Sequence, residues 1–192
     1  MMMKFFSVLL FTYMSTARAE TIALRAGADV VSSVGATAGA NSQNQMGNLT
    51  LGINSTSDIS GPYGLNFGIE YVGRKFVFSS FYEARQFRTN YTDLLYAGTY
   101  TAPAHFSGMT TVTTFLGGFS AIPTNSDVSS EAAVHPITSH GVYLATRGKI
   151  PMTETADLGA EAWIKSGLTR AFQDSTGLRN LFSFGVGVSL LF

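Results

Sequence analysis

The side chains in this sequence that are best suited to covalent chemistry are Glu131, His135, Ser139 and His140. Nucleophilic catalysis needs a hydroxyl within hydrogen-bond reach of a base, which a third group in turn orients. Ser139 and His140 are neighbours, so on a β-strand their side chains would point to opposite faces. The spacing therefore disfavours a nucleophile–base pair, and we predict no catalytic residue and no enzymatic activity.

Metal, cofactor and nucleic-acid sites are also disfavoured by the composition. The 192-residue chain has no cysteine and three histidines (His105, His135 and His140), too few ligands for a convergent metal site. Its 12 basic residues balance its 12 acidic residues, so nothing attracts nucleic acid electrostatically. We predict no cofactor, no metal and no nucleic-acid partner.

Ten charged residues of the predicted strands are spaced so that they could pair with one another rather than act in catalysis. Most members lie at the parity opposite the large apolar residues of a predicted strand, and side chains alternate between strand faces. Five members are basic and five are acidic. We expect them to form an ion-pair network inside a closed sheet: Arg25, Asp29, Glu70, Glu83, Arg85, Asp93, Arg147, Lys149, Glu161 and Lys165.

The alternation predicts about eight strands that would position these charges. They cover 21–31, 63–72, 75–86, 91–101, 106–119, 139–150, 157–170 and 181–192, and the faces of 106–119 cannot be assigned. Gly73-Arg74 is predicted as a tight turn. The Ser-, Asn- and Thr-rich segments 32–61 and 120–138 are predicted as long loops, the first with room for a strand extension at 48–53.

The fold class follows from composition and pattern together. Only 12% of residues are charged and the mean hydropathy is +0.18, yet the chain after its leader has no run of about 20 apolar residues. These features favour an all-β, antiparallel up-and-down transmembrane β-barrel with its apolar face outward. A soluble, lipocalin-like barrel with the apolar face inside is the alternative, and the scarcity of charges argues against it.

Aromatic residues near strand ends or at outward positions are expected to form a girdle. They are Tyr63, Tyr71, Tyr82, Tyr91, Tyr96, Tyr100, Phe172 and Phe192.

The amino terminus reads as a secretory signal. Lys4 precedes a short apolar run, and Ala17-Arg18-Ala19 has the pattern of a cleavage site. We expect a signal peptide at 1–19 and a single barrel domain at 20–192. The short connections near 73, 103 and 153 would then share one end of the barrel with both termini, the periplasmic end.

The last predicted strand, LFSFGVGVSLLF at 181–192, is apolar at every even position and ends on Phe192. It resembles the terminal strand of bacterial outer-membrane barrels. The chain after the leader resembles the small eight-stranded barrels of the OmpA transmembrane-domain and OmpX/Ail type. The resemblance implies a monomer in the outer membrane of a Gram-negative bacterium, in contact with lipid, with Phe192 read by the barrel-insertion machinery.

The same resemblance implies a structural or surface-interaction role, in adhesion or resistance, with a host or surface ligand bound through loops 32–61 and 120–138. A small channel, a lipid-modifying enzyme and a soluble periplasmic binding barrel are the alternatives. The lipid A deacylase family carries His-x-Ser on one strand face, and this sequence has no such motif.

Overall fold

The computed structural model describes residues 21–34, 41–43, 45–79, 84–104, 106, 108–127, 135–174 and 177–192. The predicted signal peptide at 1–19 lies outside these residues. The strands are β1 (Thr21–Val34), β2 (Asn41–Gln43), β3 (Gln45–Ser60), β4 (Tyr63–Ser79), β5 (Ala84–Pro103), β6 (Thr111–Asp127), β7 (His135–Pro136), β8 (Ser139–Pro151), β9 (Asp157–Gly167), β10 (Phe172–Asp174) and β11 (Gly177–Leu191).

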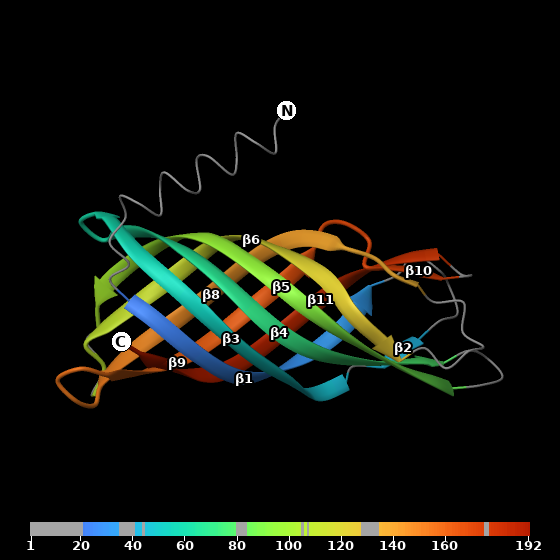
Figure 1. Cartoon of the computed structure of the whole chain (residues 1–192), viewed down its shortest axis with the longest axis horizontal. Coiled ribbons are helices and arrows are strands. Elements are labelled where there is room, and N and C mark those ends of the chain that lie inside the picture. Colours follow the sequence, from blue (N-terminus) through green and yellow to red (C-terminus); the bar gives the residue numbers. More distant parts are fainter. Residues whose placement is uncertain are drawn as a thin grey trace.

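The eight long strands form a closed antiparallel barrel (Figure 1). The order is β1-β3-β4-β5-β6-β8-β9-β11, and β1 pairs with β11 to close it. At the closing seam the backbones of Ile22 and Phe192 exchange two hydrogen bonds, at 3.1 and 2.9 Å. The short strands β2, β7 and β10 extend the sheet at the opposite end of the barrel. The predicted fold class and strand number are confirmed.

The prediction of a loop at 32–61 is wrong, because β3 occupies most of that segment. The inward side chains of β3 are polar and buried, among them Asn48, Thr50 and Asn54, while Leu49, Leu51 and Ile53 point outward. The interior of this barrel is polar, so the buried face of β3 is made of polar residues. The segment therefore has a composition that is typical of a loop although it forms a strand.

The prediction of a turn at Gly73-Arg74 is also wrong, because β4 continues through both residues and pairs with β5 as far as Ser79. The turn before β4 lies at Gly61-Pro62, where Gly61 has φ +56°, a left-handed conformation that glycine adopts without strain. The prediction omitted β3 and divided β4 into two strands. These two errors cancel in the count, so the predicted number of eight strands agrees with the structure.

Other boundaries also differ from the prediction: β1 continues to Val34, β5 begins at Ala84 rather than 91, and β11 begins at Gly177 rather than 181. Strand β6 begins at Thr111 rather than 106 and continues to Asp127, so the second predicted loop is shorter than 120–138. Strand β9 ends at Gly167, before the predicted limit of 170. The unassigned faces of β6 are now defined, since Phe115 and Phe119 are buried inside and Leu116 is exposed outside.

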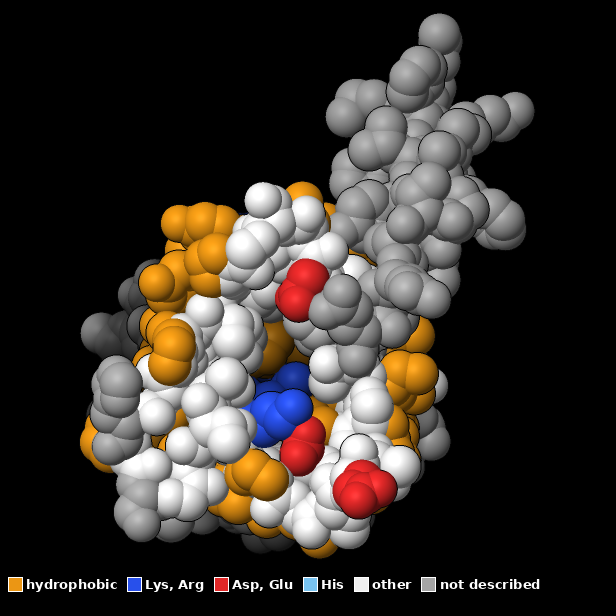
Figure 2. Space-filling view, turned by 90° about the vertical axis from the view of Figure 1, so that its left-hand side faces the viewer, with side chains coloured by type: hydrophobic (Ala, Val, Ile, Leu, Met, Phe, Trp, Pro, Cys, Tyr) orange, Lys and Arg blue, Asp and Glu red, His pale blue; other side chains and the backbone are white. Residues whose placement is uncertain are grey.

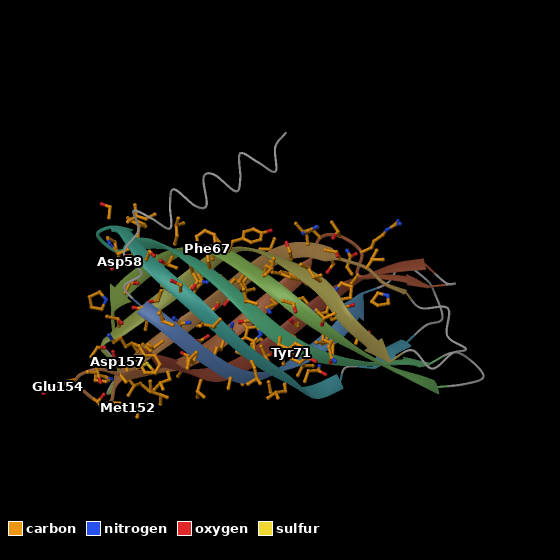
Figure 3. The ribbon with its side chains drawn as sticks, in the orientation of Figure 1. Asp58, Phe67, Tyr71, Met152, Glu154 and Asp157 are labelled. Carbon is orange, nitrogen blue, oxygen red and sulfur yellow. The ribbon has the colours of Figure 1, made fainter. Side chains whose placement is uncertain are left out.

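The apolar face points outward, which excludes the lipocalin-like arrangement. On β11 the exposed side chains include Phe182, Phe184, Val186, Val188 and Phe192. Figure 3 shows Phe67 and Tyr71 on the outer side of β4, where both are exposed. Tyr91 is an exception to the predicted girdle, because it is fully buried inside the barrel. No helix in the described ranges is long and apolar enough to cross a membrane.

The two ends of the barrel differ. Strands β3, β5 and β8 end, and β4, β6 and β9 begin, at the end where β1 begins and β11 stops, on the left of Figure 1. Figure 3 places Asp58, Met152 and Glu154 at this end. We call it the terminal end, and the opposite one the distal end. The terminal end has its own polar pair, Lys149 Nζ to Asp157 Oδ2 at 2.6 Å.

Candidate functional site: a charge cluster inside the barrel

Among the side chains that the structure describes, eight charged ones are buried inside the barrel, and we call them the interior charge cluster. They are Arg25, Asp29, Glu70, Arg74, Asp93, Arg147, Glu161 and Lys165, four cations and four anions. All are 6% exposed or less. Because an isolated charge is costly to bury, such a cluster is stable only when its members are paired and hydrogen-bonded.

Lys165 lies at the centre of the interior charge cluster. Its Nζ donates to Glu70 Oε2 at 2.7 Å and to Asp93 Oδ2 at 2.6 Å. Lys165 lies on β9 and Glu70 on β4, four strands apart in either direction around the barrel. The bond between them therefore crosses the lumen. Since the interior of an eight-stranded barrel is only wide enough for side chains, this bridge fills its middle.

Arg25 links the two halves of the cluster across the seam. It pairs with Glu70 on β4 and, through Nε, with Glu161 Oε2 on β9 at 2.9 Å. The other oxygen of Glu161 accepts from Arg147 Nε at 2.7 Å. Arg25 also donates to the Tyr143 hydroxyl at 3.3 Å. One carboxylate thus serves two guanidinium groups.

Arg74 completes the cluster and was missed by the sequence analysis, which placed it in a turn. Its Nη2 donates to Asp93 Oδ2 at 2.7 Å. Arg74 continues the inward parity of Glu70 and Val72, so the alternation would have identified it if the strand had been extended. Asp29 is also buried, on β1 opposite Asn48 of β3.

Each buried cation lies over an aromatic ring. Arg25 is 3.7 Å from the centroid of Trp163, Arg74 is 4.7 Å from Tyr91, Arg147 is 4.9 Å from Phe115 and Lys165 is 6.0 Å from Phe119. A desolvated cation–π contact contributes about 2 kcal/mol or more. The rings therefore stabilise the cations and also fill the lumen.

Three glycines make room for Trp163. A Cβ added to Gly185 would lie 2.3 Å from the indole, one on Gly27 would lie 2.4 Å away, and one on Gly187 would lie 3.1 Å away. The indole therefore lies directly against the backbones of β1 and β11, with Arg25 on its ring. Gly185 and Gly187 of the final strand therefore have a packing role.

Seven of the ten predicted interior charges lie in the cluster: Arg25, Asp29, Glu70, Asp93, Arg147, Glu161 and Lys165. Lys149 does not, because its side chain is 44% exposed at the terminal end. Glu83 lies outside the described residues. Arg85 lies in β5, but its side chain is not among those described.

Of the potentially reactive residues, Ser139 and His140 are not brought together, and the side chain of His135 is not among those described. Ser139 is buried and His140 exposed, so they do point to opposite faces. His140 Nδ1 is instead 2.9 Å from Ser120 Oγ on the outer surface, and its backbone N–H donates to Thr169 Oγ1. Glu131 lies outside the described residues. Nowhere in the described ranges do three or more His, Cys, Asp or Glu gather in a group suited to a metal.

Solved structures provide the comparison for this geometry. OprG from Pseudomonas aeruginosa, an outer membrane protein, superposes with a TM-score of 0.66 at 13% identity, covering 92% of this chain and 97% of that one. The chain folds as a small outer-membrane-type β-barrel. Neisserial surface protein A gives a TM-score of 0.57 at 14% identity, covering 91% of this chain and 97% of that one.

A third outer-membrane protein shares this outer-membrane-type fold. AlkL, solved in lipid bilayers, gives a TM-score of 0.51 at 12% identity, covering 90% of each chain. No protein-family profile and no curated protein matches the sequence. At these identities the likeness concerns the fold of the barrel alone.

Proposed function

We propose that this protein is an integral outer-membrane barrel of a Gram-negative bacterium that does not conduct, and that it acts by structural support or through its distal end. The apolar surface supports the placement. The outward row of β11 from Phe182 to Phe192 spans about 26 Å, from a rise of about 3.4 Å per residue and a tilt of about 40°. That length matches the apolar band of such barrels, which is about 25 Å tall.

The observation that carries the non-conducting role is the bridge from Lys165 to Glu70 and Asp93, which crosses the lumen. Ions would have to displace paired, buried charges to pass. In planar lipid bilayers the purified barrel should therefore show no stepwise conductance under conditions in which an open porin conducts. Unitary current steps that scale with salt concentration would contradict the proposal and favour a small channel.

The distal end is the proposed surface for a partner. The chain between β1 and β3, and between β6 and β8, connects strands there and includes parts of the predicted loops 32–61 and 120–138. If these connections carry adhesion or resistance, replacing 128–134 by a Gly-Ser segment of equal length should abolish binding to host cells or survival in serum. The barrel itself should remain in the membrane. Unchanged binding and survival would leave structural support as the role.

The carboxy-terminal Phe192 is proposed as the insertion signal. It is 55% exposed on the lipid-facing row and hydrogen-bonds to Ile22 through its backbone. Phe192→Ser should lower the amount of assembled barrel in the outer membrane severalfold, measured as the band that shifts on boiling. Phe182→Ser removes a phenyl ring from the same outward face of β11 and should lower it less. Equal losses would indicate general apolar contact rather than a terminal signal.

A further inference from the structure

The interior charge cluster is not evenly neutral along the barrel. Three of its members lie about four residues from the terminal ends of β1, β8 and β9, and we call them the lower tier. They are Arg25, Arg147 and Glu161, whose formal charges sum to +1. The upper tier holds the remaining members, Asp29, Glu70, Arg74, Asp93 and Lys165, a net charge of −1. Arg25 of the lower tier also pairs with Glu70 of the upper tier, so Arg147 is the cation of the cluster that faces the terminal end.

Arg147 is the most accessible cation of the cluster. Its side chain is 7% exposed, compared with 0% for Arg25, 2% for Arg74 and 1% for Lys165. Figure 2 views the terminal end and shows a hollow with basic side chains at its base and an acidic one beside them. Arg147 lies four residues from the end of β8, about 10 Å at the usual rise and tilt. We call this hollow the vestibule.

The walls of the vestibule are mostly polar, and the Lys149–Asp157 pair lies nearer its mouth on the same inward parity as Arg147 and Glu161. Inward-facing Asn66 and Thr99 are buried near the terminal end, and Thr101 bonds to Thr113 at 3.0 Å. Ser189 is 1% exposed, and its Oγ has no hydrogen-bond partner among the described residues. A Cβ added to Gly159 would touch both Ser189 and the Arg147 side chain, so these two groups flank the same glycine.

We propose that the vestibule binds an oxyanion, a carboxylate or phosphate group of a small polar molecule, between Arg147 and Ser189. Arg147 uses Nε for Glu161, and both oxygens of Glu161 are occupied by guanidinium groups. The planar fork of arginine matches carboxylate and phosphate oxygens, and the unbonded Ser189 hydroxyl supplies a further donor. The bound anion gives Arg147 a second counter-charge beside Glu161, which Arg147 shares with Arg25. The orientation of the opening toward the periplasm rests on the proposed function. The binding of an oxyanion in the vestibule does not depend on it.

The test uses the purified full-length barrel in detergent, titrated with sodium phosphate or sodium acetate at constant ionic strength and followed by calorimetry. Trp163 is the only tryptophan, and it stacks on Arg25, which shares Glu161 with Arg147, so its fluorescence provides a second readout. Binding should be saturable for phosphate or acetate, but not for chloride. Arg147→Gln should weaken it about tenfold or more, the value of a charged hydrogen bond, and Arg147→Lys should retain part of it.

A second measurement stays informative if Arg147→Gln fails to fold. The sequence lacks cysteine, so Thr101→Cys places a single thiol on the vestibule wall. A negatively charged thiosulfonate should modify it faster than a positively charged one, and phosphate should slow the reaction. The proposal is overturned if phosphate and acetate show no saturable binding, if Arg147→Gln binds them as the unaltered protein does, or if phosphate gives no protection.

Discussion

Replacing Lys165 by Met should destabilise the barrel by about 3–5 kcal/mol, the usual effect of removing one partner from a buried ion pair. Lys165→Met keeps an unbranched side chain of similar length but leaves Glu70 and Asp93 facing each other without the shared cation. Urea unfolding in lipid vesicles, followed by Trp163 fluorescence, measures the change.

Lys149→Met is the matched control for this prediction. Lys149 also pairs with a carboxylate, Asp157 at 2.6 Å, but its side chain is 44% exposed. An exposed pair contributes about 0–1 kcal/mol, so the control should be nearly neutral. Adding Asp93→Asn to Lys165→Met should restore part of the loss, because it returns the interior charge cluster to a net charge of zero. If the two lysine variants were equally stable, the bridge across the lumen would have no role in stability.

Gly185→Val should prevent assembly or cost more than about 3 kcal/mol, beyond the usual range for an overpacked core. Its Cβ would lie 2.3 Å from Trp163, and the indole cannot move away because Gly27 lies against its other edge. Valine is ordinarily favourable in a strand, so the expected sign is opposite to that of β-propensity. Circular dichroism during urea unfolding and the boiling-dependent shift on a gel measure it.

Gly98→Val provides the control, because a Cβ there meets nothing closer than a carbonyl oxygen at 3.8 Å, and the residue is exposed outside the barrel. It should assemble normally. Adding Trp163→Ala to Gly185→Val should restore assembly if the clash with the indole is the cause. Loss of assembly in the double variant as severe as in Gly185→Val would contradict that explanation.

The sequence predicted the parts of the barrel in which large apolar residues mark one face. Strands β8, β9 and β11 were identified with their faces, and this placed Arg147, Glu161 and Lys165 inside. Strand β3 and Arg74 were missed for a related reason. A strand with a polar buried face has the composition of a loop, and Gly-Arg within a strand has the composition of a turn.

The partners inside the lumen could not be predicted from the pattern. Alternation with period two assigns a side chain to a face, but which residues meet across a barrel depends on the stagger between strands. The bridge from Lys165 to Glu70 and the stacking of Arg25 on Trp163 both depend on that stagger. The sequence therefore predicts which residues belong to the interior charge cluster better than it predicts which of them pair with each other.

The position of Arg25 has a consequence for assembly. Arg25 lies on β1, which closes the barrel against β11, and its carboxylate partners Glu70 and Glu161 lie on opposite sides of that seam. An open sheet that has not yet joined its first and last strands cannot satisfy both carboxylates with the same guanidinium. A partly assembled barrel would thus contain a buried carboxylate without its guanidinium partner, which costs free energy. We expect folding and closure to occur as one cooperative event, without a stable half-barrel.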